Sequence, residues 1–316
     1  MNVSESPVVV ITPSFRRDFD LFKELHSSFL QYFPPGATHL VAVPPDDLDL
    51  FRRVESPQLK VINQLDLMPD GFRYVGVYTR RLATVFRQPI LSKLQYLRLW
   101  PRPAFVRGWI AQQAVKLSLS ARAVSDVVLI VDSDVVFIRP VGSSDIKKMS
   151  TELYVARAVV GNDMNEHRIW HRSAEALLGL AHDSRSQLDD YISPCLPWNT
   201  SMVRRALSRA SGVHEAGWLD AVLRSKEFSE CIFYGRFAES QQYEDVLQPA
   251  GELALCHWST SPLTEADQSN FLAGLRERHI AMQIQSTSST SLYIRRRLAA
   301  VAREMYQSGR FEGSNS

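Results

Sequence analysis

Cysteine is scarce in this sequence, and its net charge is small. The 316 residues include three cysteines, Cys195, Cys231 and Cys256, which lie too far apart for a zinc-binding spacing. An odd number of scattered cysteines also argues against a disulfide framework and favours a reducing compartment. The formal net charge of +2 argues against general nucleic-acid binding. We therefore expect no nucleic acid among the partners of this protein.

Long apolar runs are also missing. The first residues carry no basic segment, and the apolar run from Val8 to Ile11 is too short for a secretory signal. No stretch approaches the length of a membrane-spanning helix. With 45% hydrophobic and 22% charged residues, the chain has an ordinary globular balance and enough length for a sizeable core. We expect a soluble, cytoplasmic protein.

Hydrophobic patterning predicts an α/β fold with a mostly parallel sheet flanked by helices. Short apolar runs alternate with helical spacing in the first part of the chain. Such alternation favours parallel strands joined by crossover helices. The predicted strands are 7–13, 38–43, 59–62 and 127–131, and the predicted helices are 18–33 and 109–123, with a turn at 44–47.

The remaining segments follow a looser pattern. Between residues 66 and 106, arginines and prolines interleave with aromatic residues. This composition predicts an irregular segment with some helix, and a candidate loop on the acceptor side of a site. Further along, the pattern predicts helices at 144–150, 175–180 and 201–208, and strands at 154–160 and 253–258.

Asp132-Ser133-Asp134 is the most informative stretch, because it follows the apolar run Val127–Val131. Such a run predicts a fully buried strand, and two carboxylates at its tip are costly unless something pairs with them. Proteins usually hold Mg²⁺ with one or two carboxylates together with substrate phosphates. The motif therefore predicts a metal and diphosphate site at the carboxyl end of a strand, where open α/β sheets bind ligands. A solvated turn is the alternative.

The sequence resembles the GT-A type of glycosyltransferase, a Rossmann-like class that uses nucleotide-diphosphate sugars. Three places carry the resemblance: Val8-Val-Val-Ile-Thr-Pro-Ser14, Asp132-Ser-Asp134 and Leu255-Cys-His-Trp-Ser259. The chain looks closer still to a little-described bacterial family of glycosyltransferases. That likeness rests on Gly108-Trp-Ile-Ala-Gln-Gln-Ala-Val-Lys116 before the metal strand and Ser229-Glu-Cys-Ile-Phe-Tyr-Gly235 after it. The match covers most of residues 7–260.

The resemblance implies metal-dependent transfer of a sugar from a nucleotide-sugar donor to a glycan or glycolipid hydroxyl, as in bacterial polysaccharide biosynthesis. Asp134 would bind Mn²⁺ or Mg²⁺, and Asp132 would share the metal or hold the donor ribose. His257 would add a nitrogen ligand, which suits Mn²⁺ better; a buried core histidine is the alternative. The residues expected at the donor are Thr12, Pro13, Ser14, Gln113, Lys116 and Ser133.

A base is needed if the transfer inverts the anomeric carbon, because the acceptor hydroxyl must lose its proton. Glu230 is the candidate, Glu244-Asp245 is the rival, and a retaining enzyme would need neither. Inversion is weakly favoured. The residues expected at the acceptor or sugar are Asn162, Trp198, Asn199 and Tyr234, with a core position as the alternative for Trp198.

Two other functions compete with glycosyl transfer. A nucleotidyltransferase acting on sugar phosphates also binds a nucleotide and a metal at strand ends. That class usually has a glycine-rich basic loop after its first strand, and Pro13-Ser-Phe-Arg-Arg17 contains no glycine. An inactive module that binds nucleotide sugars is the non-enzymatic alternative.

The C-terminal part of the chain is predicted to be a tail. We expect a GT-A type catalytic domain over residues 1–285, and then a low-complexity break and a basic helix within 286–316. The helix, Leu292 to Tyr306, has apolar residues near one side and several arginines. It could make weak peripheral contact with an anionic membrane at the inner face, or dock its apolar side on the catalytic domain.

Overall fold

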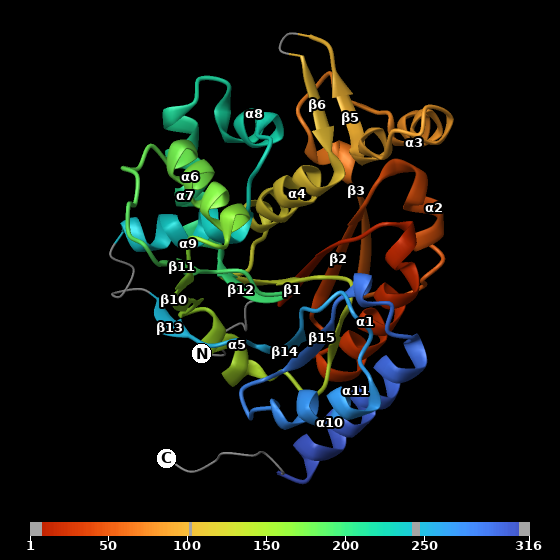
Figure 1. The fold of residues 1–316 in the computed structure, drawn as a ribbon. Coiled ribbons are helices and arrows are strands. Elements are labelled where there is room, and N and C mark those ends of the chain that lie inside the picture. The colour runs from red at the N-terminus through yellow and green to blue at the C-terminus, as the bar shows by residue number, and fades with distance from the viewer. Residues whose placement is uncertain (1–7, 101–102, 242–246, 310–316) are drawn as a thin grey trace.

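The computed structural model describes residues 8–100, 103–241 and 247–309. Its centre is a five-stranded sheet in the order β12-β7-β1-β2-β3, in which β12 is antiparallel to β7 and all other neighbours are parallel. The chain therefore has the predicted α/β architecture with a mostly parallel sheet (Figure 1). The strands are β1 (Val9–Pro13), β2 (Thr38–Val43), β3 (Leu59–Asn63), β7 (Val127–Val131) and β12 (Cys195–Asn199).

Helices cover both faces of this sheet because side chains alternate along its buried strands. Val10 and Leu129 pack with α1 (Phe19–Tyr32) in one core cluster. Ile11 and Ile130 pack with α4 (Gly108–Arg122) in another. The predicted strands and the two crossover helices are thus confirmed within a residue or two. A short helix, α2 (Leu48–Phe51), follows the turn after β2.

The segment from 66 to 106 is more ordered than the sequence predicted. It forms an arm, residues 71–100 and 103–107, that projects from the central sheet (Figure 1). A three-stranded antiparallel sheet carries a helix on this arm. The sequence predicted some helix here, which the helix on the arm confirms, but it did not predict the three strands, because they are only two to five residues long. These elements are β4 (Arg73–Tyr74), α3 (Gly76–Val85), β5 (Leu94–Arg98) and β6 (Ala104–Arg107).

Helices and short strands of the second half flank β12. The strand predicted at 154–160 is two strands that pair with different partners. The helix predicted at 201–208 is part of a longer one, and the helix predicted at 175–180 overlaps the end of a longer one that stops at Leu178. The elements are α5 (Ser143–Met149), β9 (Glu152–Tyr154), β10 (Ala156–Val160), α6 (Asn165–Leu178), β11 (Leu188–Asp190), α7 (Thr200–Val213), α8 (Gly217–Arg224), α9 (Glu230–Ser240) and β13 (Gln248–Ala250).

A second three-stranded sheet supports the end of β7. Its order is β14-β15-β8, built from β8 (Val135–Phe137), β14 (Ala254–His257) and β15 (Ala281–Ile284). The basic C-terminal helix, α11 (Leu292–Gln307), buries Leu298, Ala299 and Ala302 in one cluster with Met282 and Ile284 of β15. Its apolar side therefore docks on the strands before residue 285. Helix α10 (Glu265–Ala273) joins β14 to β15.

Short 3-10 turns complete the described chain, at Arg16–Asp18, Pro45–Asp47, Gln64–Leu67, Pro89–Lys93 and Ser286–Ser288. Within the described ranges, no helix combines the length and apolar character needed to cross a membrane.

Candidate functional site

Asp132, Ser133 and Asp134 form the tight connection between β7 and β8, at the carboxyl end of the parallel strands. The turn is closed by a hydrogen bond from Val135 N–H to the Asp132 carbonyl. Ser133 is buried, and its Oγ lies 2.9 Å from Ser14 Oγ and 3.3 Å from the Pro13 carbonyl oxygen. The predicted motif and the residues after β1 therefore meet at one edge of the sheet.

Asp134 is half-buried and only partly satisfied. Its Oδ2 accepts hydrogen bonds from Ser286 N–H at 2.7 Å and from Gln283 Nε2 at 3.1 Å. Its Oδ1 is buried without a partner among the described residues. Burial, and then the negative charge of Asp132, raise the pKa of Asp134 to about 7. The raised pKa means that the buried carboxyl holds its proton more tightly than an ordinary aspartate does.

Gln283 and Ser286 were not among the predicted site residues. Strand β15 is four residues long and fully buried, so its alternation was too short to recognise. The break at 286–291 was interpreted as low complexity, although it supplies a backbone donor to Asp134.

Lys116 joins two of the predicted site residues. Its Nζ lies 3.0 Å from Asp132 Oδ1 and 2.9 Å from Glu230 Oε1. Burial favours the neutral amine, but the two carboxylates outweigh it and hold the pKa of Lys116 well above its ordinary value. Lys116 is therefore a fixed cation between Asp132, which is partly exposed, and Glu230, which is buried.

Gln113 contacts Glu230, the buried member of the cluster formed by Asp132, Lys116 and Glu230. It lies one turn before Lys116 on α4, and its Oε1 accepts a hydrogen bond from Glu230 N–H at 3.1 Å. The bond satisfies one of the free N–H groups at the start of α9. The two motifs around Gln113 and Glu230 are thus one packed unit, although they are more than a hundred residues apart.

Two further charges surround the aspartates. Arg295 of α11 is buried and donates to the carbonyls of Gln285 and Thr290, which fixes the segment that carries Ser286. Asp18 lies near enough for the charge of Asp132 to matter: burial first, and Asp132 after the opposing Arg17, shift the pKa of Asp18 to about 6. Neither residue was a predicted site residue.

His257 does not join the aspartates. Its Nε2 is 3.0 Å from the Ser261 carbonyl oxygen, and its ring meets Phe271 edge-on. Over the described residues, no three His, Cys, Asp or Glu side chains are placed to hold one metal ion. Among the described residues, His257 is therefore not brought together with Asp132 and Asp134, and these two carboxylates are the predicted ligands that lie at the same turn.

Several predicted contact residues have structural partners instead. Thr12 is fully buried and its Oγ1 lies 3.0 Å from His39 Nε2. Trp198 is 1% exposed and stacks on Tyr234, whose hydroxyl accepts from Asn199 N–H. Asn199 also caps α7 through Met202 N–H. The ring of Trp198 has no exposed face for a sugar, so the core alternative accounts for it.

The other predicted contacts lie apart from this cluster. Asn162 is exposed in the turn before α6, and no contact joins it to the aspartates. Glu244-Asp245, the rival base, lies outside the described residues.

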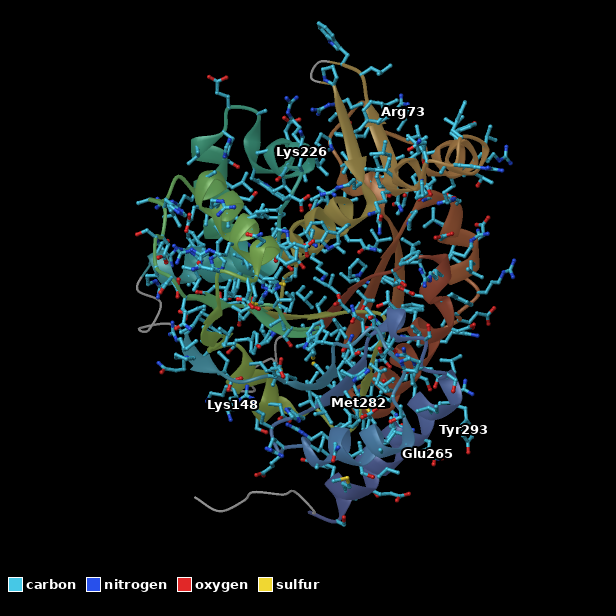
Figure 2. All side chains as sticks on the ribbon, in the orientation of Figure 1. Arg73, Lys148, Lys226, Glu265, Met282 and Tyr293 are labelled. Carbon is cyan, nitrogen blue, oxygen red and sulfur yellow. The ribbon has the colours of Figure 1, made fainter. Side chains whose placement is uncertain are left out.

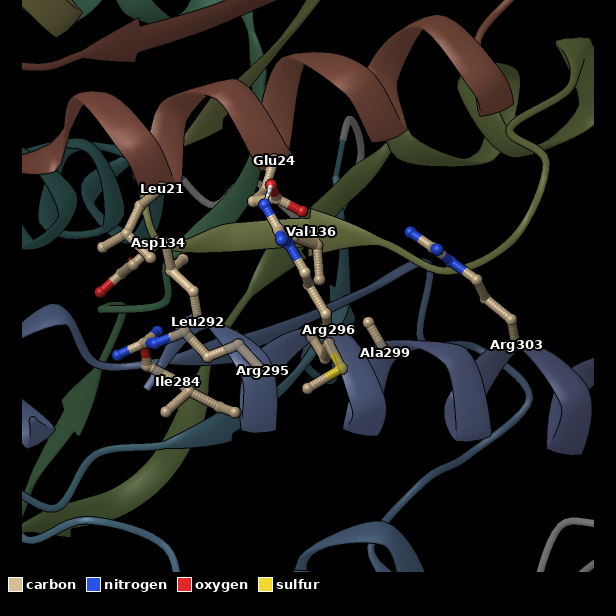
Figure 3. Close-up of a pocket in the computed structure, with 11 residues that line it drawn as sticks. Leu21, Glu24, Asp134, Val136, Ile284, Leu292, Arg295, Arg296, Ala299 and Arg303 are labelled. Carbon is tan, nitrogen blue, oxygen red and sulfur yellow. Dashed lines mark hydrogen bonds and ion pairs between the residues drawn. The ribbon is translucent and has the colours of Figure 1, made fainter. Parts of the chain in front are cut away.

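A small cavity lies between α1 and α11, with Asp134 among its lining residues. Figure 3 shows Glu24 of α1 reaching Arg296 of α11 across it, an ion pair of 2.6 Å. Its volume of about 60 Å³ is far below the roughly 300 Å³ or more of a typical ligand pocket. This cavity is therefore too small to be a ligand pocket by itself, whereas Asp132 beside it is partly open to solvent.

Comparison with known proteins gives one match. A family model described as "Family of unknown function (DUF6492)" matches residues 9–297. No curated protein matches. The matched region runs from β1 into α11 and includes every residue of the cluster described above.

Proposed function

We propose that this chain, which belongs to the family of unknown function DUF6492, is a metal-dependent glycosyltransferase that moves a sugar from a nucleotide-diphosphate donor to a hydroxyl acceptor. The observation that carries the proposal is the placement of Asp132 and Asp134 at the carboxyl end of β7, beside Ser14 at the end of β1. Open α/β sheets bind ligands at this edge. A GT-A type arrangement and a glycan or glycolipid acceptor are part of the proposal.

The two aspartates fit a hard divalent cation. The buried Oδ1 of Asp134 has no partner in the described chain, and Asp132 has an exposed side. Mg²⁺ or Mn²⁺ held by two carboxylates leaves positions for diphosphate oxygens. When bound, such a cation neutralises the charge that develops on a leaving nucleoside diphosphate. Lys116 orients Asp132 through their ion pair, and the Ser133–Ser14 contact fixes the turn between the carboxylates.

An inactive nucleotide-sugar-binding module is the second candidate. It is favoured by one observation: the ion pair with Lys116 occupies part of Asp132, so the metal site has few free ligands. A nucleotidyltransferase gains no comparable support, because the described chain after β1 has a 3-10 turn without glycine instead of a glycine-rich loop.

A panel of nucleotide-diphosphate sugars tests the proposal by thermal shift with and without Mn²⁺. We expect one donor to raise the melting temperature by roughly 5 °C at saturating concentration, and only with the metal. Hydrolysis of that donor then separates enzyme from binding module. A metal-dependent shift without any turnover would favour the module, and no shift with any donor would contradict both.

Glu230 has two possible roles, which one variant separates. As the base, Glu230→Gln should lower turnover by about 10²- to 10⁴-fold and leave donor affinity unchanged. As a partner of Lys116 alone, it should lower stability and leave turnover per folded molecule unchanged. Glu227→Gln is the control, because Glu227 lies three residues earlier and pairs with Arg107 at a partly exposed position. A fully active Glu230→Gln enzyme would move the base to Glu244-Asp245 or indicate retention.

A further inference from the structure

The arm gathers exposed apolar side chains. Sixteen large apolar residues are exposed in the described chain, and eight of them lie between residues 78 and 105. Soluble proteins rarely place so many on one projecting element, and such patches mark interaction surfaces. The eight are Tyr78, Leu82, Val85, Phe86, Ile90, Leu99, Trp100 and Phe105.

Helix α3 turns its larger apolar face outward. Its buried positions are the small residues Gly76, Thr79 and Ala83, and Thr79 Oγ1 bonds the Leu94 carbonyl at 2.6 Å. Tyr78, Leu82 and Val85 stand at helical spacing away from these buried positions, and Val85 is 73% exposed. The C-cap residue Phe86 follows at the end of the helix and is 63% exposed. An amphipathic helix normally buries its large apolar side, so this stripe lacks a partner in the described fold.

The charge of the arm is one-sided. No aspartate or glutamate occurs between residues 71 and 125, and the arm carries exposed Arg73, Arg80, Arg81, Arg87 and Lys93. Arg80 pairs with Asp46 of the central domain at 2.6 Å. Figure 2 places Arg73 on the arm, at the opposite end of the molecule from Tyr293 of α11.

We propose that the arm docks on an anionic lipid bilayer surface, with the outer stripe of α3 and the hairpin residues Leu99 and Trp100 entering the interface. Interfacial helices combine an apolar face with flanking arginine and lysine, and tryptophan and tyrosine are enriched at membrane interfaces. The uniform positive charge matches anionic headgroups. A symmetric second copy fits poorly, because an isologous contact would bring the same basic residues together.

This placement differs from the membrane contact through the C-terminal helix, which the sequence offered as one of two alternatives. Helix α11 packs its apolar side against the β14-β15-β8 sheet and lies at the end of the molecule away from the arm (Figure 1). On the arm, β6 runs directly into α4, which carries Gln113 and Lys116. Docking of the arm is independent of the proposed activity, since it concerns lipid binding alone.

Vesicle co-sedimentation of the full chain tests the proposal. We expect binding to phosphatidylcholine vesicles that contain phosphatidylglycerol, and none to phosphatidylcholine alone. Replacing Arg81, Arg87 and Lys93 with glutamine should weaken binding at least tenfold, because each basic side chain near an anionic surface contributes roughly fivefold. Leu82→Ser with Phe86→Ser should weaken it comparably.

Tyr293→Ser with Arg296→Gln is the matched control, because both residues are exposed on α11. This variant should bind like the natural sequence, and circular dichroism should show all variants folded. Vesicle binding lost in the α11 control and kept in the arm variants would overturn the proposal. So would absence of binding to anionic vesicles, or a dimer in light scattering that the arm variants dissociate.

Discussion

Asp134→Asn is expected to make the metal-free protein more stable near pH 8 and to abolish its response to Mn²⁺. The carboxyl of Asp134 titrates near pH 7 in the folded chain, against an ordinary value near 4. Between about pH 4 and 7 the folded state therefore keeps a proton that the unfolded state has lost. The retained proton stabilises the folded state at low pH, and this stabilisation disappears as the pH rises through the window.

The size of this effect is on the order of 2 kcal/mol, after allowing for the partial exposure of Asp134. Buried histidines act in the opposite direction, since burial lowers the pKa of His26, His171 and His279 to about 4. The histidines are the same in both proteins, so the difference in the free energy of unfolding between Asp134→Asn and the natural sequence reports the contribution of Asp134 alone. Urea denaturation in chelator from pH 4 to 8 measures it, and a difference that does not grow with pH would contradict the assignment.

Metal binding should show the same titration. A cation requires the ionised carboxylate, so Mn²⁺ affinity should fall as the pH drops below about 7 and be lost in Asp134→Asn. Asp145→Asn is the control, because Asp145 is a partly buried carboxylate paired with Arg139 away from the site. Unchanged Mn²⁺ affinity in the Asp134 variant would remove the main support for the proposed metal site.

Lys116→Met should be the most destabilising single change at the site, with a loss of about 3–5 kcal/mol in the free energy of unfolding. The substitution leaves the buried carboxylate of Glu230 without its cation, 2.9 Å away in the natural protein. The double variant Lys116→Met with Glu230→Gln should recover much of the loss, because no buried charge then remains unpaired. Urea denaturation measures both.

Lys148→Met is the matched control for this prediction. Lys148 also pairs with a glutamate, Glu152 at 3.9 Å, but its side chain is 68% exposed. Its loss should change the free energy of unfolding by less than about 1 kcal/mol. If Lys116→Met and Lys148→Met lower the free energy of unfolding by the same amount, the buried ion pairs of Lys116 contribute no more to stability than an exposed ion pair.

The sequence predicted the parts of the fold whose pattern is local. The strand Val127–Val131 and the helix from Phe19 have long, regular apolar periods, and both were confirmed. Some helix was predicted between residues 66 and 106, but the bounds of α3 were not, because its large apolar residues are exposed and its buried positions are small. The strand expected at 154–160 is divided at Val155, where the pairing partner changes from β13 to β11, and no residue type in this run signals that change.

The candidate site was predictable where residue type alone signals chemistry. Asp132 and Asp134 stand out in any buried strand end, and Lys116 and Glu230 were both singled out. Their ion pair was not foreseen, because it depends on α4 and α9 packing together. Gln283 and Arg295 are ordinary residues in sequence and gain importance only through their distances to Asp134 and its supporting segment. His257 is the opposite case: histidine is a common metal ligand, but in the fold its ring contacts the Ser261 carbonyl oxygen.

The partners of Asp134 are synthesised long after Asp134 itself, which affects the order in which the site can form. Ser286, which donates to Asp134, and Arg295, which fixes the segment around it, are encoded about 150 residues after the aspartate. Chains emerge from the ribosome with the N-terminus first. A nascent chain that has formed β7 therefore carries a carboxylate without its hydrogen-bond donors until the last helix is released. Chains truncated by premature termination before Ser286 would keep the Asp132-Ser133-Asp134 motif and lack the Ser286 donor and the Arg295 charge, both of which favour the ionised form of Asp134 and lower its pKa.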